Sequence, residues 1–158
     1  MEKEKLLKLY KSLVSNEKFK VKEEKRVPVE VGQVRVLFWV PEEYVLVYDV
    51  EESGLVHAVP LTIWTDLTTT SLRIRLRSSL DNSQKTLAPL PFYVYLRREV
   101  LEQESLPIYI VREDTVEKVL RALERAPVRT AIKPSWRFIK LVWRRYYDLM
   151  IASILYTT

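Results

Sequence analysis

Cysteine is missing from this 158-residue chain, and histidine occurs only once, at position 57. Without cysteine there is no disulfide bond, no thiolate nucleophile and no cysteine-based metal site. His57 lies in an alternating stretch that is typical of a strand, and no pair of carboxylates stands at ligand spacing around it. The sequence therefore predicts no metal site, and nothing in it indicates a cofactor.

Glycine and long apolar runs are also scarce. With only two glycines, the chain has neither a glycine-rich phosphate loop nor a nucleophile-elbow motif. No run of about 18 apolar residues occurs, so we expect no membrane span. The first residues, MEKEKLLKLYKSL, are charged and do not resemble a signal peptide, which makes a cytoplasmic protein the expectation.

Charged residues, in contrast, are abundant and make up 30% of the chain, while Asn, Gln and Met are few. This balance is typical of thermophilic proteins, in which surface ion pairs replace thermolabile amides. The formal net charge is +5. A positive charge of this size permits a nucleic acid or an acidic protein as a partner, although it does not require either.

The middle of the chain predicts a mainly β domain at residues 27–125. Its strands are expected at residues 27–31, 34–40, 44–51, 55–63, 71–77, 86–96 and 107–111, where short alternating runs are separated by turn residues. Strands of this number and spacing favour a small barrel or a sandwich. Asp114 and Glu117 stand at capping positions for a helix over residues 114–125, which closes the domain.

An amphipathic helix is expected on each side of this β domain. Residues 1–22 predict an N-terminal helix, with apolar side chains at helical spacing, followed by a charged connector. Residues 126–134 contain two prolines and predict a linker. Residues 135–158 predict a C-terminal amphipathic helix. Its apolar and aromatic side chains are Trp136, Ile139, Val142, Trp143, Tyr146, Leu149 and Met150.

These C-terminal side chains are candidates for a protein interface. Trp and Tyr dominate the energetics of many interfaces, and an amphipathic helix that docks in a groove is a recurrent binding mode. We therefore predict binding of a partner protein, or self-association, through this helix, to give a dimer or a hetero-complex. An alternative that the sequence leaves open is that the helix covers the barrel of its own chain.

Arginines at a period of two mark the best polar surface. Arg73, Arg75 and Arg77 project from one face of a predicted strand about 7 Å apart, a spacing that suits neighbouring phosphates. Arg97 is predicted to extend this nucleic-acid-binding surface, although a solvated sheet face would have the same pattern. Binding of single strands usually adds exposed aromatic side chains. The candidates are Trp39, Trp64, Tyr93 and Tyr95, which are also candidate core residues.

From about residue 31 to residue 123, the order of elements resembles that of the PemK/MazF-like toxins. The similarity lies in an opening strand GQVRVLFWV, the strand VLVYDV, a strand that ends in AVPLT, a basic strand, and then PFYVYLRREVL with a capped helix. This resemblance implies an SH3-like barrel with attached helices, usually dimeric. The active members of that family cut single-stranded RNA without a metal.

The resemblance also implies where a catalytic site would lie. Active members pair an arginine with a threonine, and Thr62 matches the threonine. The arginine position falls near Glu42, Glu43 or Tyr44, where a carboxylate would repel the phosphate being cleaved. Whether Arg35 or Arg73 replaces it in space stays open.

The function expected first is that of a non-catalytic MazF-like regulatory protein that binds a protein partner through its helices. The resemblance implies a toxin–antitoxin origin, with sigma-factor control and antiviral signalling as settings for such a protein. Two alternatives remain. One is a metal-independent endoribonuclease toxin that uses Thr62 and a nearby arginine, and the other is a non-catalytic nucleic-acid-binding module that uses the arginine strand.

Overall fold

The computed structural model describes residues 21, 25–37, 43–68, 70–125, 137 and 139–147. Within these residues, no helix has the length and apolar character needed to cross a membrane. Several of the sequence predictions fall outside the described residues. These are the N-terminal helix, the linker at residues 126–134, and the side chains of Trp39, Glu42, Trp136, Leu149 and Met150.

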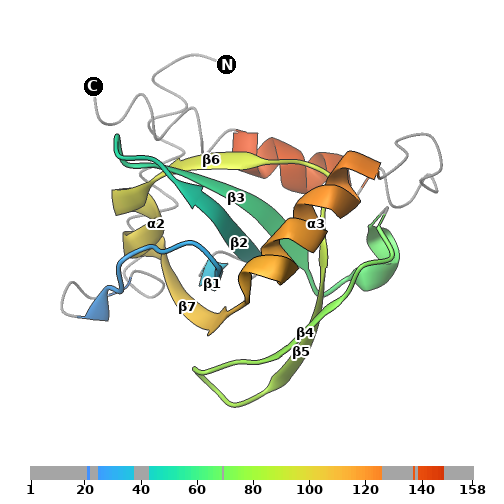
Figure 1. Ribbon diagram of the computed structural model, residues 1–158, viewed down its shortest axis with the longest axis horizontal. Helices are drawn as coiled ribbons and strands as arrows, with labels where there is room; N and C mark the ends of the chain where they lie inside the picture. The colour runs from blue at the N-terminus through green and yellow to red at the C-terminus, as the bar shows by residue number, and fades with distance from the viewer. Residues whose placement is uncertain are drawn as a thin grey trace.

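Seven antiparallel strands in the described part of the chain form a nearly closed barrel (Figure 1). They are β1 (Gln33–Leu37), β2 (Glu43–Val50), β3 (Leu55–Thr62), β4 (Ile74–Arg77), β5 (Gln84–Pro89), β6 (Val94–Arg97) and β7 (Ser105–Ile110). Their order is β4-β5-β3-β2-β1-β7, and β6 pairs with β3. Ser79, just after β4, donates its backbone N–H to the carbonyl of Ile108 in β7 at 2.9 Å, which links the two ends of the sheet.

The hairpin of β2 and β3 confirms the strands predicted at residues 44–51 and 55–63, which are separated by the turn Glu-Ser-Gly at residues 52–54. The turn is closed by a hydrogen bond of 2.8 Å from the N–H of Glu51 to the carbonyl of Leu55. Gly54 has a φ of +93°, a conformation that residues with a side chain rarely adopt. A turn that needs this backbone angle explains why one of the two glycines stands here.

The single strand predicted at residues 86–96 is wrong, because the structure has two strands there. β5 ends at Pro89 and pairs with the last residues of β3, whereas β6 begins at Val94 and pairs with Leu55–Ala58 at the other end of β3. Pro91 lies in the break and has no N–H to donate to a ladder. The chain instead turns through a hydrogen bond of 2.9 Å from Phe92 N–H to the Leu90 carbonyl.

The strand predicted at residues 27–31 is also wrong, since residues 27–30 have no regular secondary structure. The side chain of Gln33 satisfies the backbone there: its amide donates to the Pro28 carbonyl at 3.0 Å and accepts from the N–H of Glu30 at 3.1 Å. Gly32, with a φ of +93°, then turns the chain into β1. Side-chain hydrogen bonds thus replace a sheet ladder in this segment.

Among the described residues, η2 (Thr65–Leu67) is a short 3-10 helix that follows β3. α3 (Glu113–Arg125) confirms the helix predicted at residues 114–125, but the predicted cap at Asp114 is wrong, because the helix begins before it and Asp114 lies in the first turn. α2 (Arg98–Glu104) was not predicted, although its sequence REVLEQE consists mostly of good helix formers. Residues 137 and 139–147 are helical as well, within the segment predicted as a C-terminal helix.

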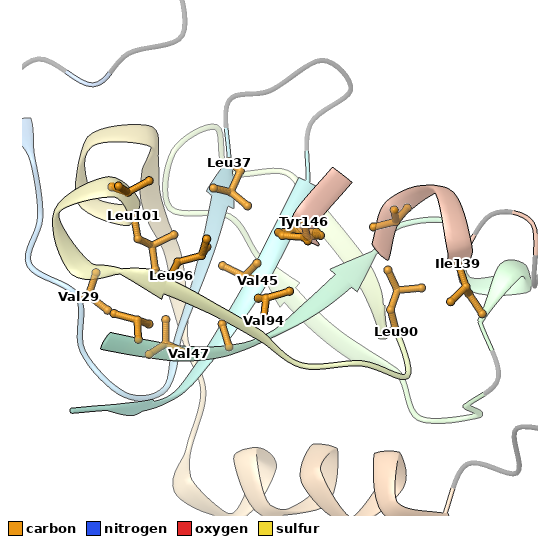
Figure 2. Close-up of a cluster of buried hydrophobic side chains, with 14 residues drawn as sticks. Val29, Leu37, Val45, Val47, Leu90, Val94, Leu96, Leu101, Ile139 and Tyr146 are labelled. Carbon is orange, nitrogen blue, oxygen red and sulfur yellow. The ribbon is translucent and has the colours of Figure 1, made fainter. Parts of the chain in front are cut away.

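Both faces of β2 are buried, each in its own hydrophobic cluster. Val45 and Val47 belong to the first core cluster, which also contains residues of α2 and, from the C-terminal helix, Ile139, Val142 and Tyr146 (Figure 2). Leu46 belongs to the second core cluster, which contains residues of α3. The C-terminal helix and α3 therefore pack on opposite faces of β2. Alternating side chains of one strand hold both of them.

Candidate functional site

A pocket opens where the start of β2 and the end of β3 meet the C-terminal helix. Tyr44 pairs with Leu61 in the antiparallel register, so Glu43 and Thr62 are neighbours at the same edge of the sheet. The pocket has an empty volume of about 370 Å³, its open mouth included, and the helix contributes Arg145 to its wall. Its polar side chains are those of Glu43, Tyr44, Thr62, Trp64, Arg145 and Tyr146.

A partly buried ion pair forms one wall of this pocket, with Glu43 buried and Arg145 half-buried. Nη2 of Arg145 lies 2.6 Å from Oε1 of Glu43. Burial raises the pKa of the Glu43 carboxyl to about 7, against the opposing effects of the Arg145 charge and of a hydrogen bond from Tyr146. Both protonation states of this carboxyl are therefore populated near neutral pH.

Tyr146 is the third polar side chain beside the pair of Glu43 and Arg145. Its side chain is fully buried, and burial together with the neighbouring Glu43 carboxylate raises its pKa well above the ordinary value. The phenol is therefore neutral, and it donates its hydrogen bond to Glu43. Together the three side chains join the edge of the barrel to the helix.

Thr62 ends β3 and is buried, with its Oγ1 accepting a hydrogen bond of 3.0 Å from the backbone N–H of Trp64. This bond is the side-chain turn that threonine commonly makes two residues ahead of itself. Trp64 stands at the mouth of the pocket and is 59% exposed. The hydroxyl of Thr62 thus has a structural role in the turn.

The pocket contains a combination of groups that sequence reading missed. The resemblance places an arginine near Glu43 in the sequence. In the structure the arginine beside Glu43 is Arg145, which comes from the C-terminal helix. Arg145 belongs to the basic residues of the segment predicted as a C-terminal helix, and this was the available signal. The helical period does not show which barrel residue the arginine meets. Neither Arg35 nor Arg73 lines the pocket. A carboxyl with a pKa near 7 beside a guanidinium can exchange protons or hold a polar ligand.

Arg35 is instead a structural residue. It lies in β1, next to β7, and its side chain is fully buried. Its guanidinium donates to Oγ and the carbonyl of Ser105 at 2.7 and 3.1 Å, to Oε1 of Gln33 at 2.7 Å, and to the carbonyl of Val27 at 3.1 Å. Burial lowers its pKa to about 10, although the charge of Glu102 acts in the other direction. These bonds tie the segment before β1 to β7.

The four predicted nucleic-acid-binding arginines do not share one surface. Arg73 is half-buried, and its guanidinium donates to the backbone carbonyls of Thr65, Thr70 and Leu72. Arg75 and Arg77 are exposed on β4, in alternation with buried residues. Arg97 pairs with Leu55 at the start of β3. β4 joins the sheet through β5, and β5 pairs with the opposite end of β3. Only Arg75 and Arg77 therefore form a continuous exposed pair.

His57 lies on the outer side of β3, where its Nε2 is 2.5 Å from Oε2 of Glu51. The rings of Tyr48 and Tyr95 meet the imidazole edge-on, at centroid distances of 5.8 and 4.9 Å. Across the residues that the structure describes, no group of three or more His, Asp or Glu side chains could hold a metal ion. The cluster is thus a cross-strand aromatic set that orients the imidazole.

The predicted interface side chains divide between the core and the surface. Ile139, Val142 and Tyr146 lie in the first core cluster, and Figure 2 shows Ile139 and Tyr146 beside the barrel strands. Trp143 is 42% exposed, and its ring stacks on that of Tyr147 at a centroid distance of 5.0 Å and an angle of 20°. The inner side of the helix thus belongs to the protein's own core, while an aromatic pair remains outside.

Comparisons with protein-family models, with curated proteins and with solved structures find no match. The class of the protein is therefore defined by its own strands: a nearly closed antiparallel β-barrel with a few helices, compatible with an SH3-like barrel.

Proposed function

We propose that this protein is a non-catalytic regulatory barrel of the PemK/MazF-like type, which binds a protein partner through the outer side of its C-terminal helix. The observation that carries this proposal is the stacked pair of Trp143 and Tyr147, exposed on a helix whose inner side is anchored in the core. Aromatic residues held rigidly at a surface lose little conformational entropy on binding, and they are typical centres of interfaces.

The ion pair in the pocket supports the non-catalytic part of the proposal. Of the arginines in the described residues, Arg145 is the one that lines the pocket of Thr62, and the ionised form of Glu43 compensates its charge at 2.6 Å. A phosphate at this site would have to displace the carboxylate or meet its negative charge. The pair also serves to fasten the helix, which explains its presence without a reaction.

The test is affinity purification of the full-length tagged protein from its native host, followed by quantitative mass spectrometry. Trp143→Ala/Tyr147→Ala is compared with Tyr95→Ala/Tyr109→Ala, a double variant that removes two tyrosines of similar exposure elsewhere on the barrel. We expect a partner that is retained by the control and reduced about tenfold or more by the helix variant. Equal recovery of the partner with both variants would show that the C-terminal helix is not part of the interface.

A second candidate function, metal-independent RNA cleavage, is favoured by one observation. The structure brings Arg145 and a carboxyl with a pKa of about 7 to the pocket of Thr62. In such a site the carboxylate would accept the proton of the RNA hydroxyl that attacks the phosphate, and the carboxyl so formed would return a proton to the leaving oxygen. The guanidinium would stabilise the negative charge that develops on the phosphate. Incubation of single-stranded RNA with a metal chelator is the test. If the wild type cleaves RNA and both Thr62→Ala and Arg145→Ala lose this activity, RNA cleavage becomes the proposed function in place of partner binding.

A further inference from the structure

An apolar groove lies between the barrel and the C-terminal helix. It is lined by Pro91, Phe92, Ile139, Lys140 and Trp143, and its empty volume is about 540 Å³, with its open side included. Its floor is well supported, since Ile139 is only 4% exposed and the ring of Phe92 meets that of Tyr146 edge-on at 6.1 Å. A preformed apolar groove of this kind suits a bulky apolar side chain of a ligand.

The rim of the groove is positively charged. Arg137, Lys140 and Arg144 are exposed on the helix, and the described residues of this helix include no Asp or Glu. Lys140 and Arg144 are one turn apart and flank Trp143. An apolar ligand that covers Lys140 would bury its ammonium group, which is costly unless the ligand supplies an anion.

We propose that this groove binds an acidic segment of the partner protein, which inserts one bulky apolar side chain beside Trp143 and places carboxylates against Lys140 and Arg144. The inference rests on the proposed function and names the chemistry of its partner. Charge complementarity selects this occupant. A second copy of the same helix would bring cations against cations, and the lining of the groove offers a nucleobase little to hydrogen-bond with.

The experiment measures the fluorescence anisotropy of a labelled synthetic peptide, rich in Glu and with one central Trp, on titration with the full-length protein. Two matched peptides carry Gln in place of Glu, or Ser in place of the Trp. We expect each change to weaken binding about tenfold or more, and added salt to weaken binding of the acidic peptide. A Gln peptide that binds as tightly as the Glu peptide overturns the proposal.

The matched protein variants are Lys140→Glu and Arg77→Glu. Both reverse the charge of an exposed side chain, but Arg77 lies on β4, away from the groove. We expect Lys140→Glu to weaken peptide binding about tenfold and Arg77→Glu to change it little. Equal effects of the two variants would indicate binding to net charge alone, which contradicts a site in the groove. Circular dichroism verifies that both variants fold.

Two further measurements test RNA and a second copy of the chain as occupants of the groove: competition with the peptide, and the oligomeric state. Single-stranded RNA that displaces the peptide at lower concentration, or a dimer in light scattering that Trp143→Ala dissolves, would each overturn the acidic segment as the occupant. Lys140→Glu is also included in the purification from the native host. A partner that is lost with Trp143→Ala/Tyr147→Ala but kept with Lys140→Glu contradicts this inference and leaves the proposed function standing. Recovery that neither variant alters contradicts both.

Discussion

Glu43, at the start of β2, lies between a guanidinium, a phenol and the core, and this environment controls its protonation. Burial raises its pKa although Arg145 and Tyr146 favour the charged form. The desolvation of a carboxylate at this depth thus exceeds the stabilisation by its partners. The titration of this one residue therefore makes the free energy of unfolding depend on pH within the neutral range.

Replacement of Glu43 by Gln tests this dependence. The folded pKa of about 7 exceeds the ordinary value of 4.5, so the folded state binds the proton more tightly than the unfolded chain does. The stabilisation from this group is therefore complete below the ordinary value and is lost as the pH rises through about 7, with a total of roughly 3 kcal/mol.

We expect urea denaturation to show that the wild type loses stability relative to Glu43→Gln between pH 5 and pH 8, as estimated by linkage. Other carboxylates titrate equally in both proteins, which makes the difference between them specific to Glu43. A wild type that gains stability relative to the variant over this range would show that the ion pair with Arg145 outweighs desolvation.

Arg35 represents the opposite case, a buried charge with several good acceptors. Arg35→Lys keeps the charge but cannot reach Ser105, Gln33 and Val27 together, because an ammonium lacks the planar fork of a guanidinium. We expect a loss of roughly 3 kcal/mol in the free energy of unfolding, measured by chemical denaturation. Arg77→Lys on exposed β4 is the matched control, with an expected change within about 0.5 kcal/mol. Similar losses would refute the structural role of Arg35.

At the level of elements, the C-terminal helix has two unlike sides. Its inner residues contribute to the first core cluster, and its outer residues form the aromatic and basic surface beside the groove. The helix is therefore part of the fold and, by our proposal, also the binding element. This dual role means that deletion of the helix would confuse loss of binding with loss of folding, so point variants are the better probes.

Ile139→Ala and Leu141→Ala separate the two sides of this helix. Ile139 is buried, whereas Leu141 is 69% exposed. We expect the first substitution to cost roughly 2–4 kcal/mol in the free energy of unfolding, because it leaves a cavity in the core. The second should change it by less than about 0.5 kcal/mol. Denaturation curves of the two variants provide the measurement, and a tolerant Ile139 would mean that the helix is not packed as described.

For the whole molecule, the candidate nucleic-acid-binding arginines and the basic residues described on the C-terminal helix lie on separate surfaces. Arg75 and Arg77 lie on β4, Arg97 ends β6, and Arg137, Lys140 and Arg144 lie on the C-terminal helix. Charges that are not gathered into one track neutralise few neighbouring phosphates of a single strand. The arrangement therefore favours weak attraction of polyanions over a dedicated nucleic-acid site.

We expect single-stranded RNA to bind weakly and to be released by moderate salt. Arg75→Gln/Arg77→Gln should reduce the slope of log affinity against log salt by roughly 1.4, the value for two phosphate contacts, and Arg97→Gln by about half as much. Filter binding over a range of salt concentrations measures these slopes. Tight binding that salt leaves unchanged would point to a specific RNA site.

The sequence predicted the fold best where its local signals were strongest. The alternation on both sides of Glu-Ser-Gly predicts β2 and β3, and the capped apolar face predicts α3. It failed at Pro91, where one apparent strand divides between the two ends of β3, and at residues 27–30, where the Gln33 side chain replaces a ladder. At Pro91 the outcome depends on strand pairing with residues that are distant in the sequence, and at residues 27–30 it depends on hydrogen bonds of a side chain. Periodicity records neither.

By itself, the sequence determined that this chain folds mainly as β with an amphipathic C-terminal segment, since period and turn chemistry are local properties of the backbone. The tertiary structure decided which charges meet. Only the packing of the helix on the barrel brings Arg145 to Glu43 and Thr62 and forms the groove beside Trp143. Such pairings depend on how elements far apart in the chain dock to bury their apolar faces, and no local pattern specifies that docking.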